Sequence, residues 1–211
     1  MNVSPLTMRR LKNFRANKRG YYAALVFCVL FLISVFAEFI ANDKPIIVVF
    51  NGQIHFPVFE KIPETYYGGE FETEADYKDP FVRDLIIQKG FFVMPLIEYS
   101  YDTINYDLKV PSPSSPTFEN LLGTDDQGRD VLARLIYGFR ISVFFGLTLT
   151  ILSSIIGIFI GGIQGFYGGK LDLFGQRFIE IWSGLPVLYL LIIISSFVEP
   201  SFWILLSIML L

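Results

Sequence analysis

The 211-residue sequence contains little of the chemistry on which most enzymes depend, with one cysteine, Cys28, and one histidine, His55. A single cysteine excludes an internal disulfide and a cysteine-based metal site. No G-x-x-x-x-G-K-[ST], H-E-x-x-H or G-x-S-x-G pattern occurs, so we expect no nucleotide, zinc-hydrolase or serine-hydrolase site. We therefore predict that the chain is not an enzyme and has no catalytic residue, metal, cofactor or nucleic-acid partner. His55 is interpreted as a structural or surface residue.

Charge is also scarce, since Asp, Glu, Lys and Arg make up 18% of a chain that is 53% hydrophobic with a mean hydropathy of +0.50. Soluble domains contain about 25% charged and about 45–50% apolar residues, so the composition favours a membrane protein. Residues 1–20 hold six basic side chains and no acidic one, whereas residues 42–138 hold sixteen acidic and eight basic ones. Because basic segments stay on the cytoplasmic side, we predict a cytoplasmic N-terminus and an extracytoplasmic acidic segment.

Long apolar runs divide the chain, and about 20 apolar residues are needed to cross a bilayer. The first run is longer than the 7–15 residues typical of a signal peptide, the alternative interpretation, so we favour an uncleaved anchor. The last run has only eleven residues, and we therefore expect the sequence to be an N-terminal fragment. The predicted order is a cytoplasmic basic leader (1–20), transmembrane helix 1 (21–41), an extracytoplasmic insertion (42–138), transmembrane helix 2 (141–165), a cytoplasmic turn (166–176), transmembrane helix 3 (177–198) and the start of a truncated helix 4 (201–211).

Small residues recur every four positions along the second predicted span. Such stripes let another helix approach closely in lipid, although glycine is also simply common in transmembrane helices. We predict a helix-packing surface formed by Gly146, Ser153, Gly157, Gly161 and Gly165. Pro186 removes a helical hydrogen bond and is predicted to kink the third span.

The insertion has the local signals of a folded, mixed α/β module. Asn51-Gly52 predicts a type I′ hairpin between residues 46–50 and 53–56. Asp79-Pro80 predicts a helix start and Gly90 its end. The apolar face expected on that helix is Phe81, Val82, Leu85 and Ile86. Residues 111–116, Pro-Ser-Pro-Ser-Ser-Pro, predict a stiff linker.

After this linker, Thr124 and Gln127 have the spacing of a capping box and predict a helix that begins at Thr124 and runs to Gly138. Apolar residues follow at helical spacing: Val131, Leu132, Leu135, Ile136 and Phe139. We expect an amphipathic helix at the outer membrane surface, with an ordinary helix of the outer module as the alternative.

Three segments, residues 122–142, 161–172 and 177–186, resemble in order and spacing the second permease subunit of oligopeptide- and dipeptide-type ABC importers. The first segment carries the family motif as Gly123, Thr124, Asp125, Gly128, Arg129 and Asp130. Residues 41–45, 67–69 and 75–80 are similar to the narrower YejE type, which is associated with peptides and peptide-like antibiotics such as microcin C.

This resemblance implies an all-α, multi-pass membrane protein of the ABC importer type I permease class, with a mixed α/β extracytoplasmic insertion, in a bacterial inner membrane. It implies a subunit of the translocation pathway for peptides. The implied partners are a second permease, two cytoplasmic ATPases, an extracytoplasmic peptide-binding protein and membrane lipid. It assigns no substrate-binding residue. The alternative is a non-transporting, membrane-anchored sensor or assembly protein.

Overall fold

The computed structural model describes residues 4–199 and 201–210. The first three residues of the predicted leader and the last residue of the predicted fourth helix lie outside this range. The chain divides into two compact units, Met1–Arg140 and Ile141–Leu211, which we describe one at a time.

The first unit begins with helices α1 (Pro5–Ala16) and α2 (Lys18–Val35). The Asn17 side chain begins α2 by accepting a hydrogen bond from the Gly20 amide at 3.3 Å. The predicted span of 21–41 is shifted, because α2 ends at Val35 and a separate short helix, α3 (Ala37–Ile40), follows. Ala37 and Ala41 are fully buried. This end of the predicted span therefore packs in the α/β module of residues 37–137.

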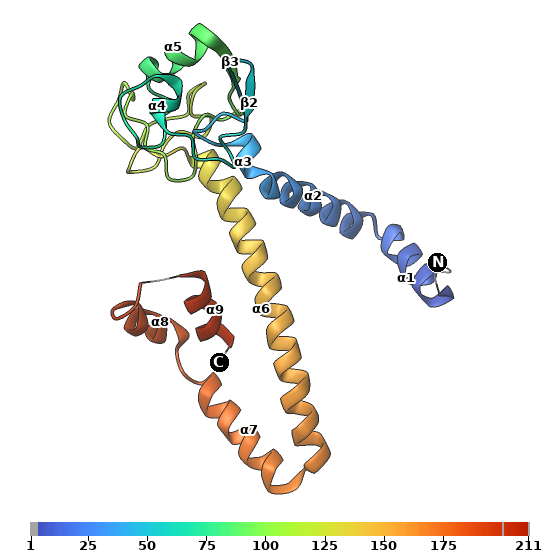
Figure 1. The fold of residues 1–211 in the computed structure, drawn as a ribbon. Helices are drawn as coiled ribbons and strands as arrows, with labels where there is room; N and C mark the ends of the chain where they lie inside the picture. Colours follow the sequence, from blue (N-terminus) through green and yellow to red (C-terminus); the bar gives the residue numbers. More distant parts are fainter. Residues whose placement is uncertain (1–3, 200, 211) are drawn as a thin grey trace. The chain divides into compact units, whose positions relative to one another are not determined.

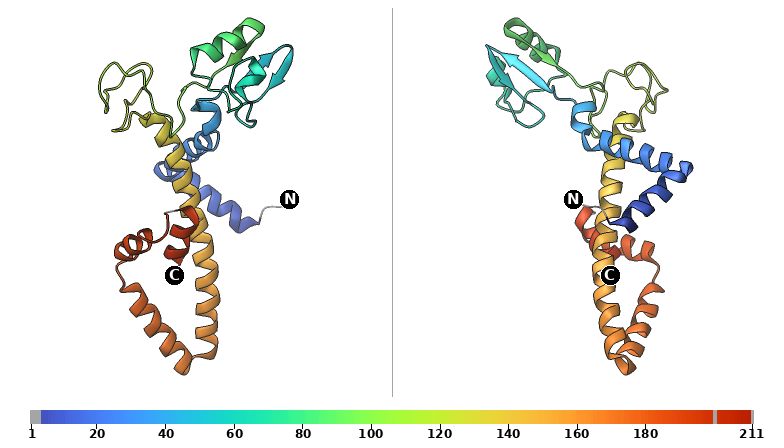
Figure 2. Two further views of the ribbon diagram at one scale, coloured as in Figure 1. Left: turned by 60° about the vertical axis from the view of Figure 1, so that its left-hand side comes forward. Right: turned by 90° about the vertical axis from the view of Figure 1, so that its right-hand side faces the viewer.

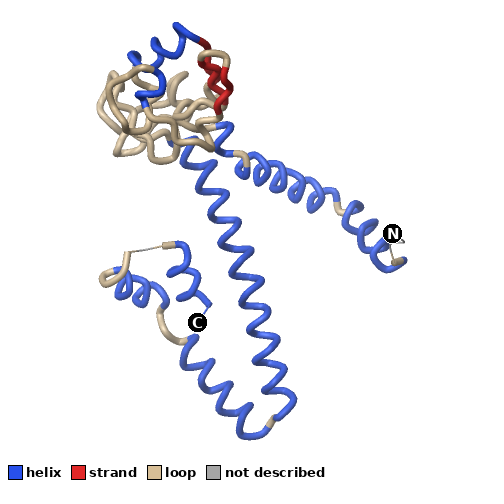
Figure 3. Tube along the Cα trace, viewed as in Figure 1, coloured by secondary structure: helices blue, strands red, loops and turns tan. Residues whose placement is uncertain are grey.

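An antiparallel sheet with the order β2-β1-β3 forms one part of this module (Figures 1 and 3). Its strands are β1 (Ile47–Phe50), β2 (Gln53–His55) and β3 (Gly90–Val93). Between β1 and β2, Asn51 and Gly52 have φ angles of 50° and 78°. Positive φ at both positions is the requirement of a type I′ turn, so the predicted hairpin is confirmed.

Helices α4 (Glu64–Tyr67) and α5 (Pro80–Lys89) complete the module, and α5 covers one face of the sheet (Figure 2). The Asp79 carboxylate accepts from the Phe81 amide at 2.8 Å, which confirms the predicted start. Val82 and Ile86 are buried as predicted, but Phe81 is 52% exposed. Successive helical residues differ by about 100°, which turns Phe81 away from the sheet.

Two hydrophobic clusters hold the first unit together. One joins the sheet, α4 and α5, and the hydroxyls of Tyr67 and Tyr77 lie 3.2 Å apart within it. Burial, and then the hydrogen bond to Tyr67, raises the pKa of Tyr77, so both rings stay neutral. The other cluster joins α3 to the start of α6 and consists of Ala37, Ala41, Ile97, Tyr99, Ala133 and Tyr137.

Helix α6 (Val131–Tyr167) runs without a break from the first unit into the second. It is followed by α7 (Gly169–Ser183), α8 (Val187–Ser195) and α9 (Phe202–Leu210). The predicted turn at 166–176 is largely helical, and the chain reverses at Gly168 and Gly169, both with φ of 57°. Gly168 combines this φ with a ψ of −157°, a region that is open essentially only to glycine.

The predicted third span, 177–198, is divided between α7 and α8, which differ in direction by 68°. Pro186 immediately precedes α8. Within residues 4–199 and 201–210, α2 and α6 are each long and apolar enough to cross a membrane, and a third span results if the bent pair is one.

Candidate functional site

The family motif forms a closed loop and is not the first turn of a helix. Both the Gln127 and Arg129 amides donate to Oδ1 of Asp125 at 2.9 Å. The Gly128 amide donates to the Asp125 carbonyl at 3.1 Å, and Gly128 has a φ of 81°. The helix predicted from Thr124 is therefore wrong, because the Asp125 carboxylate captures the amides that a helix would need. Helix α6 begins seven residues later, at Val131.

Asp130 is the residue that starts α6. Its Oδ1 accepts from the Ala133 amide at 2.7 Å, and its Oδ2 accepts from the Asn120 side chain at 2.9 Å. Asn120 in turn accepts from the Asn105 side chain at 3.0 Å. Asp130 is 0% exposed and Asn120 1%. The helix N-terminus and these donors stabilise a buried carboxylate, which fixes the loops of residues 105 and 120 to the start of α6.

Gly123 and Thr124 attach the proline-rich segment to the same loop. The Thr124 hydroxyl accepts from the Ser114 amide at 3.0 Å, and Thr124 is 4% exposed. Gly123 has a φ of 75°, and a Cβ there would collide with the Ser114 carbonyl oxygen. Residues 111–116 have no regular structure, as predicted, and Ser114, the buried residue of this segment, holds it to the motif.

Two arginines surround Asp125. Its Oδ2 accepts from Arg129 Nε at 2.9 Å and also pairs with Arg134. Burial by itself would raise the pKa of Asp125. The amide hydrogen bonds from Arg129 and Gln127, with the two guanidinium groups, outweigh burial and lower this pKa to about 2. Asp125 is therefore a carboxylate at physiological pH, and it ties the loop to the first turn of α6.

A second set of contacts joins α6 to α3, the short helix that follows α2. Arg140 Nη1 lies 2.7 and 2.8 Å from the two carboxylate oxygens of Glu38 in α3. One turn earlier, the Tyr137 hydroxyl donates to the Ala41 carbonyl at 2.9 Å. Ala133 and Tyr137 are the buried residues of α6, whereas Leu135, on the predicted apolar face, is 56% exposed. The pattern of large apolar residues missed this contact because its centre is an alanine and a tyrosine.

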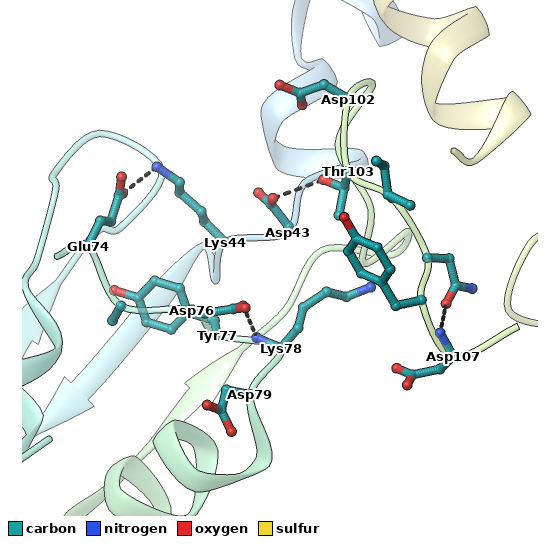
Figure 4. Close-up of a pocket in the computed structure, with 14 residues that line it drawn as sticks. Asp43, Lys44, Glu74, Asp76, Tyr77, Lys78, Asp79, Asp102, Thr103 and Asp107 are labelled. Atoms are coloured by element: carbon teal, nitrogen blue, oxygen red, sulfur yellow. Dashed lines mark hydrogen bonds and ion pairs between the residues drawn. The ribbon is translucent and has the colours of Figure 1, made fainter. Parts of the chain in front are cut away.

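Beside the sheet, the module contains a cavity of about 620 Å³ (Figure 4). Segments 43–44, 74–79 and 102–107 line it. Lys44 pairs with Glu74, and the Thr103 hydroxyl donates to Asp43 at 2.9 Å. Lys78 Nζ lies 3.1 Å from the centre of the Tyr99 ring, and burial lowers the pKa of Lys78. No cluster of three or more metal-ligating side chains occurs in the described part of the chain.

The predicted packing residues lie further along α6, in the second unit. At Gly146, Gly157, Gly161 and Gly165, no atom of the described chain lies within 4 Å of where a Cβ would stand. Thr150 donates to the Gly146 carbonyl at 2.7 Å and Ser153 to the Thr150 carbonyl at 3.3 Å. Both hydroxyls are thus bonded within their own helix, which leaves a smooth apolar surface on α6.

Comparison of the sequence with known proteins finds similar membrane permeases. Over 98% of its length the chain is 47% identical to the inner membrane ABC transporter permease protein YejE of Escherichia coli. It is 48% identical over 99% of its length to the peptidoglycan transport system permease protein YejE of Agrobacterium fabrum. The chain covers 60% and 61% of these two relatives, so it spans about three fifths of their length. No protein-family model matches it.

A shorter match is 52% identical over 38% of the chain and 28% of its relative, the dipeptide transport system permease protein DppC of Haemophilus influenzae. The apolar helices fit a helical membrane protein, and the matched relatives are named as permease proteins. The chain is similar to the YejE permeases over nearly its whole length, which confirms the resemblance predicted from its motifs.

Proposed function

We propose that this protein is a permease subunit of an ATP-driven importer and forms part of a membrane pathway for peptides or peptide-bearing compounds. The observation that carries the proposal is 47–48% identity to two ABC permeases over nearly every residue of the chain. One of these relatives is named for peptidoglycan transport, and the DppC relative is named for dipeptides. ATP hydrolysis belongs to other subunits, and this chain is not itself an enzyme.

The proposed topology is multi-pass in a bacterial inner membrane with the N-terminus in the cytoplasm. The basic side chains before α2 support this orientation: Arg9, Arg10, Lys12, Arg15, Lys18 and Arg19. Helices α2 and α6 are the first two spans, and the bent pair α7–α8 is the third. The α/β module between α3 and α6 is then extracytoplasmic, and residues 168–169 form the cytoplasmic reversal.

The partners proposed for the complete transporter are a second permease, two cytoplasmic ATPases, an extracytoplasmic peptide-binding protein and membrane lipid, with no nucleic acid. The small-residue surface of α6 supports a helical partner, because it has open space at four glycines. The Glu38–Arg140 pair and the Asp130 cap support a role for the outer module as a rigid collar on the spans.

Uptake provides the direct test. The gene encoding this chain is expressed with the companion permease, ATPases and binding protein from the same genome, in cells lacking their own peptide permeases. Accumulation of a labelled tripeptide should require all components and should stop when the ATPase Walker lysines are replaced. Uptake that continues without the gene for this chain would contradict the proposal, and an import-deficient ATPase variant is the control for leakage.

A further inference from the structure

Three phenylalanine rings from separate segments form a continuous patch at the outer end of α2. Phe36 follows α2, Phe39 lies in α3 and Phe59 lies in the loop after β2. The ring centres of Phe36 and Phe39 are 6.4 Å apart, and those of Phe39 and Phe59 are 5.7 Å apart. Twenty residues separate Phe39 from Phe59, so the insertion returns to the end of the first apolar helix. We call these three residues the Phe patch.

The Phe patch is exposed although the rest of this region is well packed. Phe36 is 55% exposed, Phe39 36% and Phe59 73%. In helix α3, Ala37 packs against the module and Glu38 pairs with Arg140. These two side chains make contacts with the module and with α6, and Phe39 stays at the surface. Large apolar side chains that remain exposed together on a folded surface indicate a binding site for another apolar surface.

We propose that the Phe patch inserts into the outer leaflet at the boundary between acyl chains and headgroups, with the lipid bilayer as its partner. The inference rests on the proposed function only in that α2 is taken as a span. The patch continues the exposed apolar surface of α2, where Leu32 is 57% exposed and Ile33 40%. A surface that continues directly from a membrane-spanning helix meets the same lipid.

Side-chain chemistry supports lipid as the partner and indicates how deeply the Phe patch lies in the bilayer. The Phe patch has no hydrogen-bonding group and no Tyr, Trp or Arg, the residues that dominate protein–protein hot spots. Polar residues follow Phe59 directly: Glu60 lies 3.6 Å from His55 and Lys61 is exposed. A basic side chain beside exposed aromatic rings is the arrangement of segments that lie at the headgroup level. The loop of Phe59 thus anchors the outer module to the membrane surface.

The test uses quenching of a bimane label by lipids with brominated acyl chains, with the whole chain in nanodiscs. Three proteins each carry one thiol: the parent with native Cys28 in α2, Cys28→Ser with Phe59→Cys, and Cys28→Ser with Ile87→Cys. Ile87 is the matched control, because it is 59% exposed on α5. We expect brominated lipid to quench the labels at 28 and 59 and to leave the label at 87 unchanged, with iodide showing the opposite pattern.

Quenching at 28 together with an iodide-accessible, unquenched label at 59 would overturn the Phe patch proposal while α2 remained a span. An unquenched label at 28 would overturn the topology in the proposed function, and the Phe patch proposal with it. A label at 59 that neither quencher reaches also overturns lipid as the partner, because protein then covers the patch. Since Phe59 is mostly exposed, its replacement should leave the unfolding temperature close to that of the parent.

Discussion

The α/β module of residues 37–137 and the helical part after Arg140 differ in where their side chains find partners. Residues 37–137 contain both hydrophobic clusters and a network of buried polar groups that are all hydrogen-bonded within the described chain. Among the described residues after Arg140, Leu206 is the one buried hydrophobic side chain. The buried polar and apolar side chains of the module find their partners within the module. The helices after Arg140 leave most of their apolar side chains exposed.

Because of this difference, some substitutions should act within the chain and others on its contacts with other molecules. A substitution in the module changes the free energy of unfolding of the module itself. A substitution on α6 beyond Arg140 should leave that free energy unchanged and act on contacts with lipid or another subunit. Hydrogen exchange of the β1 amides in nanodiscs reports the module's unfolding free energy and can separate the two cases.

The largest expected effect comes from the core of the module. Ile86→Ala should lower its unfolding free energy by about 2–5 kcal/mol, because Ile86 is 0% exposed and the substitution leaves a cavity. The neighbouring Ile87→Ala should change it by less than about 0.5 kcal/mol, since Ile87 is 59% exposed. Equal effects of the two variants on β1 exchange would show that the module is not packed through α5.

A smaller effect is expected at the start of α6. Asp130→Asn should cost about 1–3 kcal/mol, because its new amide would face the donor amide of Asn120. Adding Asn120→Asp should recover part of the loss by restoring a donor–acceptor pair between the two positions. Asp126→Asn, on an exposed neighbour, is the control. If the double variant is no better than the single one, the Asn120–Asp130 hydrogen bond does not hold these loops.

Local signals predicted those parts of the fold in which the deciding contacts are close in sequence. The turn at Asn51-Gly52 and the helix start at Asp79-Pro80 each depend on a dipeptide, and both predictions were confirmed. The predicted start of the helix was wrong. Thr124 and Gln127 have capping-box spacing, but the Asp125 carboxylate accepts hydrogen bonds from the backbone amides and holds them in a loop. Two neighbouring acids at helix-start spacing allow either outcome, and contacts with distant residues decide between them.

The site was predictable in its residues but not in its contacts. The six motif residues could be named from the resemblance, and the structure gathers them into one loop. Their partners Asn105, Asn120 and Ser114 lie in a segment without helical or strand periodicity, and no sequence pattern points to these contacts. Glu38 and Arg140 are 102 positions apart, and only the packing of α3 on α6 brings them together.

A still smaller effect should appear as a pH dependence of the module. The folded pKa of Asp125, about 2, lies below its ordinary value of 3.8. The unfolded chain therefore binds the proton more readily, and the stabilisation present above about pH 4 is lost as pH falls toward 2. With solvent screening this amounts to about 1 kcal/mol. Asp125→Asn should remove this part of the acid dependence in urea titrations at pH 2–5, and Asp126→Asn should retain it.

The smallest expected effect on the module comes from α6. It also tests most directly whether the module and the helices after Arg140 depend on different partners. Gly157→Leu with Gly161→Leu should leave β1 hydrogen exchange unchanged, because no atom of the described chain lies within 4 Å of either Cβ position. The same variant should sharply reduce copurification with the companion permease and peptide uptake, since two leucines keep a second helix from close approach. Ile158→Leu, at a position that is 76% exposed on the same helix, is the control for a leucine introduced without added volume. Normal assembly of the double variant would show that α6 meets lipid at these glycines, and the helical partner would have to pack on another face.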